Sequence, residues 1–149
     1  MKTIEKMEDL ATFNQLLNEN DETLKGIRIW DTYRQALPLL ERCIADSKTR
    51  GIVTETICVI GAYVKGKEIL HLPQALEIIE RIKRCIDDDL VRRECEKCQR
   101  EMIENFLALE RDEKVICETQ RFTHQWFKDQ GLNSGHIANL FFEASEEVT

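Results

Sequence analysis

The side chains best suited to chemistry in this chain are cysteines and a histidine in its second half. Cys95 and Cys98 form a Cys-x-x-Cys pair, and Cys117 and His124 would complete four ligands of the kind that zinc binds tetrahedrally. The pair lies inside a segment that we expect to be helical, where residues three apart share one face and line the core. Because free cysteine packs as a small hydrophobic residue, the sequence favours packing roles and no bound metal or cofactor. A zinc-stabilised regulatory domain is the alternative that these four residues leave open.

A second ligand-like pair stands before Pro73. Glu68 and His71 have the Glu-x-x-His spacing that directs two ligands to one side of a helix in di-iron bundles. Such a site requires a second pair, and the residues three positions before the other two histidines are Arg121 and Asn133. We therefore expect His71 to be a loop residue.

The sequence motifs of common hydrolases and nucleotide-binding enzymes are missing. The chain contains no Gly-x-Ser-x-Gly, no P-loop and no Gly-x-Gly-x-x-Gly, and it has three serines in all. We therefore expect a protein that is not an enzyme.

A run of basic residues raises the question of nucleic acid. Arg93, Lys97 and Arg100 would share one helical face, which could contact phosphate. Acidic residues are interleaved with this run, and the formal net charge of the chain is −7. The pattern favours a solvated face of mixed charge, and a nucleic-acid-associated factor remains the alternative. The basic residues in question are Arg81, Lys83, Arg84, Arg92, Arg93, Lys97 and Arg100.

The elements that carry these residues are predicted to be helices. No glycine or proline occurs from Gln74 to Gln130, and the whole chain has 6 Gly and 2 Pro. We predict an all-α fold, a single-domain bundle of about six helices over residues 1–149. Within it, residues 88–130 form either one helix about 64 Å long, at about 1.5 Å per residue, or two helices divided in the polar stretch 110–114. No internal repeat is present, which argues against a solenoid.

Helix ends follow from capping residues and glycines. We expect Thr3 to cap the first helix, Asp87 to Asp89 to cap the helix that follows them, and Gly131 to end a helix as its C′ residue, with Ser134 capping the last one. Residues 1–22 can form an N-terminal arm, and residues 145–149 a frayed tail.

The middle of the chain is harder to assign. A second helix is expected from about Ile27 to Ala45, kinked at Pro38, followed by a loop over residues 47–51. Residues 52–64 fit either a helix or a buried strand, and we choose the helix because no second strand-like segment could pair with it. The next helix, from Leu72, is predicted to be amphipathic, with its charged residues outward. They include Glu77, Glu80, Arg81, Lys83 and Arg84.

Aromatic residues gather towards the end of the chain. Phe141 and Phe142 are adjacent, so a helix cannot bury both in one direction, and the outward one can contribute to an interface. We take Trp126, Phe127, Phe141 and Phe142 as the candidate interaction surface.

Composition and the search for targeting signals limit the possible functions. Charges stand where a secretory signal would have an apolar core, and the longest uncharged apolar run is far shorter than the roughly 20 residues that span a bilayer. Six cysteines in such a chain indicate reduced thiols, so we expect a cytoplasmic protein, with the nucleus also open and no membrane partner. Our leading hypothesis is a non-catalytic helical interaction protein, an adaptor, inhibitor or regulatory subunit, that self-associates as a homodimer. Composition suits a virus-encoded accessory factor that binds host proteins and a cellular adaptor equally.

Overall fold

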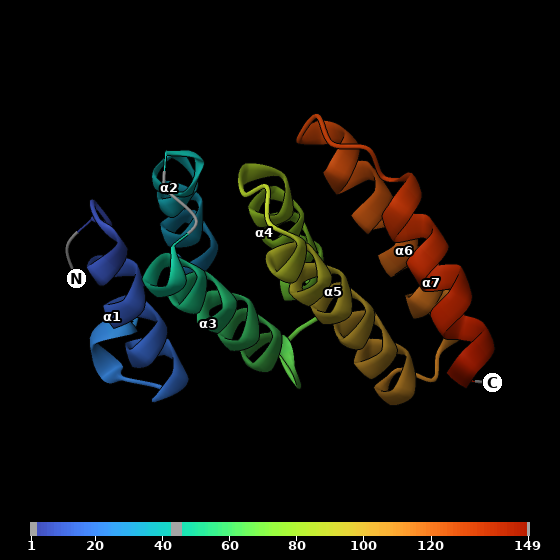
Figure 1. Ribbon diagram of the computed structural model, residues 1–149. Helices are drawn as coiled ribbons and strands as arrows, with labels where there is room; N and C mark the ends of the chain where they lie inside the picture. The colour runs from blue at the N-terminus through green and yellow to red at the C-terminus, as the bar shows by residue number, and fades with distance from the viewer. Residues whose placement is uncertain (1–2, 43–45, 149) are drawn as a thin grey trace.

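The computed structural model describes residues 3–42 and 46–148, which form seven α-helices, one short 3-10 turn and no strand (Figure 1). The all-α prediction is confirmed, with one helix more than expected. The elements are α1 (Met7–Asn18), η1 (Glu22–Leu24), α2 (Ile29–Glu41), α3 (Ser47–Val64), α4 (His71–Cys85), α5 (Asp89–Leu109), α6 (Glu113–Asp129) and α7 (Gly135–Val148). The prediction of a helix over residues 52–64 is also confirmed.

The helices of this bundle lie in two layers. In one layer α1, α3, α5 and α7 each pack against the next, and in the other α4 packs between α2 and α6 (Figure 1). This order resembles the stacked helical pairs of α-solenoids, although the sequence has no repeat. This order needs no repeat, because stacking requires an apolar stripe on each inner face and not the same residues in each pair.

Helix α4 is the centre of the molecule. It contacts α2 and α6 in its own layer and α3 and α5 in the other. Every residue from 75 to 80 is consequently buried, including Glu77 and Glu80. Our prediction that these two carboxylates point outward is wrong, because a central helix has no side that is left entirely to solvent.

A buried polar link joins the first three helices. Asn14 of α1 donates from Nδ2 to Thr56 Oγ1 of α3 at 2.8 Å and accepts from the Tyr33 hydroxyl of α2 at 2.9 Å. Leu10 and Phe13 on the same helix are fully buried, and α1 packs along α3. These contacts fix how the segment that we considered as an arm lies on the bundle.

Two helix starts differ from the sequence prediction. Helix α1 begins at Met7 rather than after Thr3, because the Asp9 carboxylate accepts the backbone N–H groups of Glu5 and Lys6. Helix α3 begins at Ser47, so the loop predicted over residues 47–51 is wrong. Asp46 caps it by accepting the Thr49 N–H at 2.8 Å, and Gly51 is inside the helix.

Helix α2 is shorter than predicted. It starts at Ile29, ends at Glu41 and contains Pro38 near its end. The last three residues of the predicted segment, Cys43, Ile44 and Ala45, lie outside the described residues.

The 88–130 segment is a pair of helices, so the single helix of about 64 Å is excluded. Asp88 caps α5 through the N–H groups of Leu90 and Val91, as expected from the aspartate run. The break after Leu109 contains neither glycine nor proline. It is held by carboxylates, since Glu110 accepts the Asp112 N–H and Asp112 accepts the Lys114 N–H to start α6.

The last turn was predicted largely correctly. Gly131 has a φ of +74° just after the end of α6, as a C′ residue requires. Asn133, next to the expected cap Ser134, accepts the Gly135 N–H at the start of α7. Helix α7 then continues to Val148, through most of the expected tail. Across the described ranges, no helix combines the length and the apolar character needed to cross a membrane.

Candidate functional site

The four candidate zinc ligands are divided between two environments. Cys95 and Cys98 are buried on α5, where the Cys98 thiol lies 3.5 Å from the Ile57 carbonyl oxygen, and burial raises the pKa of both thiols to about 12. Cys117 and His124 are exposed on α6, beside a depression shared with α7. No group of three or more potential metal ligands is assembled anywhere in the described residues.

His71 has a packing role at the edge of the core. It is the first residue of α4 rather than a loop residue, and its Nδ1 accepts from Trp30 Nε1 at 3.0 Å. The Tyr63 ring meets it edge-on, with centroids 5.8 Å apart. Glu68 is exposed in the preceding loop, and the described residues form no group of three potential ligands around this pair.

The basic run is largely neutralised by neighbouring acids. Arg81 pairs with Glu77, Lys83 and Arg84 pair with Glu80, and Arg100 pairs with Glu104. Three of these pairs lie on α4, and the pair of Arg100 with Glu104 adds an acid to the face that Arg100 was expected to share with Arg93 and Lys97 on α5.

Two of the four residues of the candidate aromatic surface belong to the core. Phe127 and Phe141 are buried at 0% and 3% exposure, whereas Phe142 is 66% exposed. Trp126 is half-buried, and Phe122 stacks on it with ring centroids 6.1 Å apart. Phe142 and part of the Phe122–Trp126 stack are therefore what this group offers to a partner.

The sequence did not indicate a buried carboxylate that joins three helices. Glu77 Oε1 accepts from Arg34 Nη2 of α2 at 2.7 Å and from Trp126 Nε1 of α6 at 2.8 Å. Glu77 Oε2 accepts from Arg81 Nε at 2.7 Å and from Arg34 Nε at 3.3 Å. Burial alone would raise the pKa of Glu77, but the hydrogen bonds from the two arginines and the tryptophan outweigh it and hold that pKa below its ordinary value.

This carboxylate is structural. Both of its oxygens are occupied by donors from the chain, and its side chain has no exposed surface, so it offers no free lone pair to a substrate. Its neighbour Glu80 is similarly satisfied by Gln99, Lys83 and Arg84. The interior polar groups of α4 thus serve packing.

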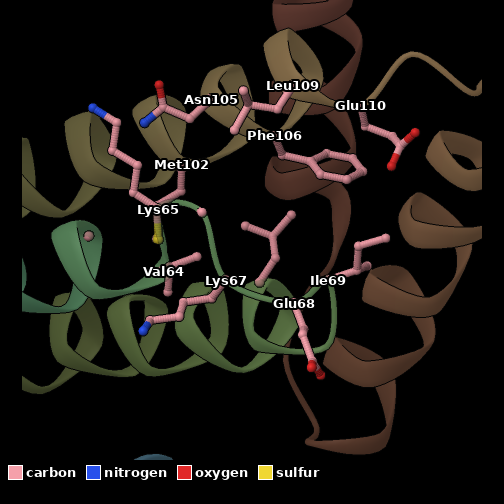
Figure 2. A pocket seen from close by; sticks show the side chains of 13 residues that line it. Val64, Lys65, Lys67, Glu68, Ile69, Met102, Asn105, Phe106, Leu109 and Glu110 are labelled. Carbon is pink, nitrogen blue, oxygen red and sulfur yellow. The ribbon is translucent and has the colours of Figure 1, made fainter.

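The surface also carries an apolar pocket at the ends of α3 and α5, shown in Figure 2. Its volume is about 150 Å³. Gly66, with a φ of +77°, ends α3 and turns the chain so that the loop before α4 forms one wall. The apolar lining comes from Val64, Ile69, Leu72, Met102, Phe106 and Leu109.

Apolar side chains remain in solvent around the mouth of the apolar pocket. Of the residues that line it, Leu109 is 70% exposed and Ile69 38%. Leu70, which follows Ile69 in the loop but is not part of the lining, is 60% exposed. Charged residues border the pocket on two sides: Figure 2 shows Lys65 and Lys67 on one side, and Glu110 and Glu68 towards the other. We call these four the charged rim.

The apolar pocket opens into a longer depression between α3 and α5. This depression has a volume of about 310 Å³ and shares Gly61, Lys65, Met102 and Asn105 with the pocket. Gly61 lets the two helices approach, since a Cβ there would lie 3.0 Å from Cys98 Sγ. Sequence reasoning missed this site because its walls come from segments some forty positions apart.

Comparison with known proteins adds no relative. No protein-family model, no curated protein sequence and no solved structure that we compared with the chain matches it.

Proposed function

We propose that this protein is a non-catalytic helical interaction module, of the adaptor, inhibitor or regulatory-subunit kind, that binds a protein partner through the apolar pocket. The observation that supports it is that two exposed apolar side chains, Ile69 and Leu109, line one preformed hollow, and that exposed Leu70 follows Ile69 in the chain. Exposed apolar residues that are contiguous and rimmed by charge are typical of interaction sites, whereas single scattered ones are not.

The rest of the chain agrees with this proposal. The buried carboxylates are saturated by internal donors, and the titratable side chains of the apolar pocket, the charged rim, stand around an apolar floor rather than converging on one point. Such a site can exclude water from an inserted apolar side chain, which is how interface hot spots contribute. It offers no nucleophile beside a base, so binding is the better proposal.

Peptide selection with matched variants tests the proposal. A random-peptide display library is selected on the purified protein, and the enriched peptides are then measured against Leu109→Glu and Leu90→Glu. Both leucines lie on α5 and are exposed, Leu90 at 48%, but only Leu109 lines the apolar pocket. Circular dichroism should be unchanged for both variants.

We expect enriched peptides to share an apolar anchor and to lose affinity for Leu109→Glu by about tenfold or more, as at other hot spots, while binding Leu90→Glu normally. Selection that enriches nothing, or peptides that bind both variants equally, would contradict this use of the apolar pocket.

A further inference from the structure

The face that carries the apolar pocket has both a hollow and protrusions. Cavities of about 150 Å³ admit an apolar group of the size of benzene, and this pocket has that volume. Leu109, which lines it, projects into solvent at 70% exposure, and Ile69 in the facing loop is 38% exposed. A surface that presents a knob beside a hole of matching chemistry is complementary to itself, which is the requirement of a two-fold interface.

The charged rim is also complementary to itself. Its basic residues, Lys65 and Lys67, lie on one side of the apolar pocket, and Glu110 and Glu68 lie towards the other (Figure 2). A two-fold axis in the plane of the interface, running between these sides, brings the lysines of one copy opposite the glutamates of the other. A partner of uniform charge would instead meet repulsion along half of the rim.

From these two observations we infer that the occupant of the apolar pocket is a second copy of this chain, docked about a two-fold axis. The inference rests on the proposed function, because it names the partner of the same pocket. Leu109 of each copy enters the apolar pocket of the other, and the two lysine and glutamate sides pair across the axis.

The surface available is long enough for such an interface. The depression and the apolar pocket together are bordered by α5 from Glu94 to Leu109, which is about 22 Å at about 1.5 Å per residue. A stable interface buries about 800 Å² on each partner, and the pocket alone is too small to supply that. The floor between α3 and α5 therefore has to join it, along Cys58, Gly61 and Ala62.

Charge reversal on the two sides of the rim tests the inference. Glu68→Lys with Glu110→Lys makes the rim basic throughout, and Lys65→Glu with Lys67→Glu makes it acidic throughout. The native mass of each protein is measured by sedimentation equilibrium over a range of concentrations, alone and as an equimolar mixture. Because Glu110 also accepts the Asp112 N–H between α5 and α6, Glu68→Lys alone serves as a second basic variant, and each variant is compared with the parent by circular dichroism.

We expect the unaltered protein and Leu90→Glu to sediment at twice the mass of one chain. Each charge-reversed variant alone should dimerise about tenfold more weakly or worse, because like charges then face one another. Their mixture should recover a dimer at least as tight as the parent, and Leu109→Glu should be monomeric. Recovery in the mixture identifies the second copy as the occupant, which a general effect of charge would not produce.

A parent protein that stays monomeric at the highest concentration overturns the inference, as does a dimer that survives both Leu109→Glu and charge reversal. These failures differ from failure of the proposed function. If the chain is monomeric yet selected peptides bind in a manner that depends on Leu109, the apolar pocket serves another protein and only the second copy is excluded.

Discussion

Replacing Glu77 tests whether one carboxylate holds three helices together. The side chain has 0% exposure and receives four hydrogen bonds, two from Arg34 and one each from Arg81 and Trp126. Removing one partner of a buried ion pair typically costs 3–5 kcal/mol. Because the two arginine side chains are 25% and 30% exposed, water can solvate them after the change, so we expect the low end of that range.

Two substitutions separate charge from packing. For Glu77→Ala we expect a loss of about 3 kcal/mol in the free energy of unfolding, close to that lower limit. Glu77→Gln keeps an oxygen that can accept from Trp126 but offers an amide to the arginines, so we expect a loss of about 2 kcal/mol. The control is Glu104→Gln, whose carboxylate pairs with Arg100 at 3.1 Å on the surface, where at most about 0.5 kcal/mol is expected.

Urea unfolding followed by tryptophan fluorescence measures these differences, with the denaturant slope expected to stay constant. Hydrogen exchange adds a local readout. Helix α6 packs mainly on α4 and α7, so the Glu77→Ala change should speed the exchange of its amides, relative to the unaltered protein, more than that of the α1 amides. Two results would show that the carboxylate does not join the helices. One is a loss of unfolding free energy in Glu77→Gln no larger than in Glu104→Gln. The other is a loss of protection in α6 of Glu77→Ala, relative to the parent, no larger than in α1.

Three further predictions concern acid, thiols and a helix start. The pKa of Glu77 is lower in the folded state than its unfolded value of about 4.3. The carboxylate should therefore stabilise the fold fully above about pH 5, and this stabilisation should be lost as the pH falls towards the folded pKa. The stability of Glu77→Gln, which lacks the carboxylate, should fall less steeply with acid. Native protein at pH 8 should react with a maleimide at exposed Cys117 and stay unmodified at Cys98, whose pKa is about 12, as peptide mass mapping would show. Asp112→Ala should lose about 1 kcal/mol in urea unfolding and Asp112→Asn much less, because asparagine also caps α6; equal losses would remove the capping explanation.

Much of the fold could be predicted from local patterns. Apolar residues recur at helical spacing, Asp88 marks the start of α5 and Gly131 the end of α6, and each of these signals acts within a single turn of chain. The division after Leu109 was only half predicted, because its capping carboxylates, Glu110 and Asp112, are indistinguishable in sequence from the other acids of a polar stretch.

The position of Glu77 could not be predicted for a physical reason. With Arg81 four residues later it has the pattern of an ordinary surface ion pair, and that pair does form. The sequence does not show that α2 and α6 both pack on α4 and bring Arg34 and Trp126 to the same carboxylate. Burial of a charge depends on partners from distant segments, and periodicity within one helix does not report them.

The apolar pocket could not be predicted either, because it depends on exposed apolar residues rather than on a buried charge. In sequence Leu109 is the last member of an ordinary apolar stripe and Ile69 belongs to a short loop, so neither suggests a surface role. In the structure both are exposed at one place, while charged Glu77 and Glu80 are buried elsewhere. The buried charges are matched by donors within the chain, but the exposed apolar residues have no comparable match. Ile69 and Leu109 come from segments forty positions apart and line one hollow, with exposed Leu70 next to Ile69, which random scatter of surface leucines would rarely produce. The apolar pocket is therefore a better candidate for binding a partner than the aromatic residues of the C-terminal helices.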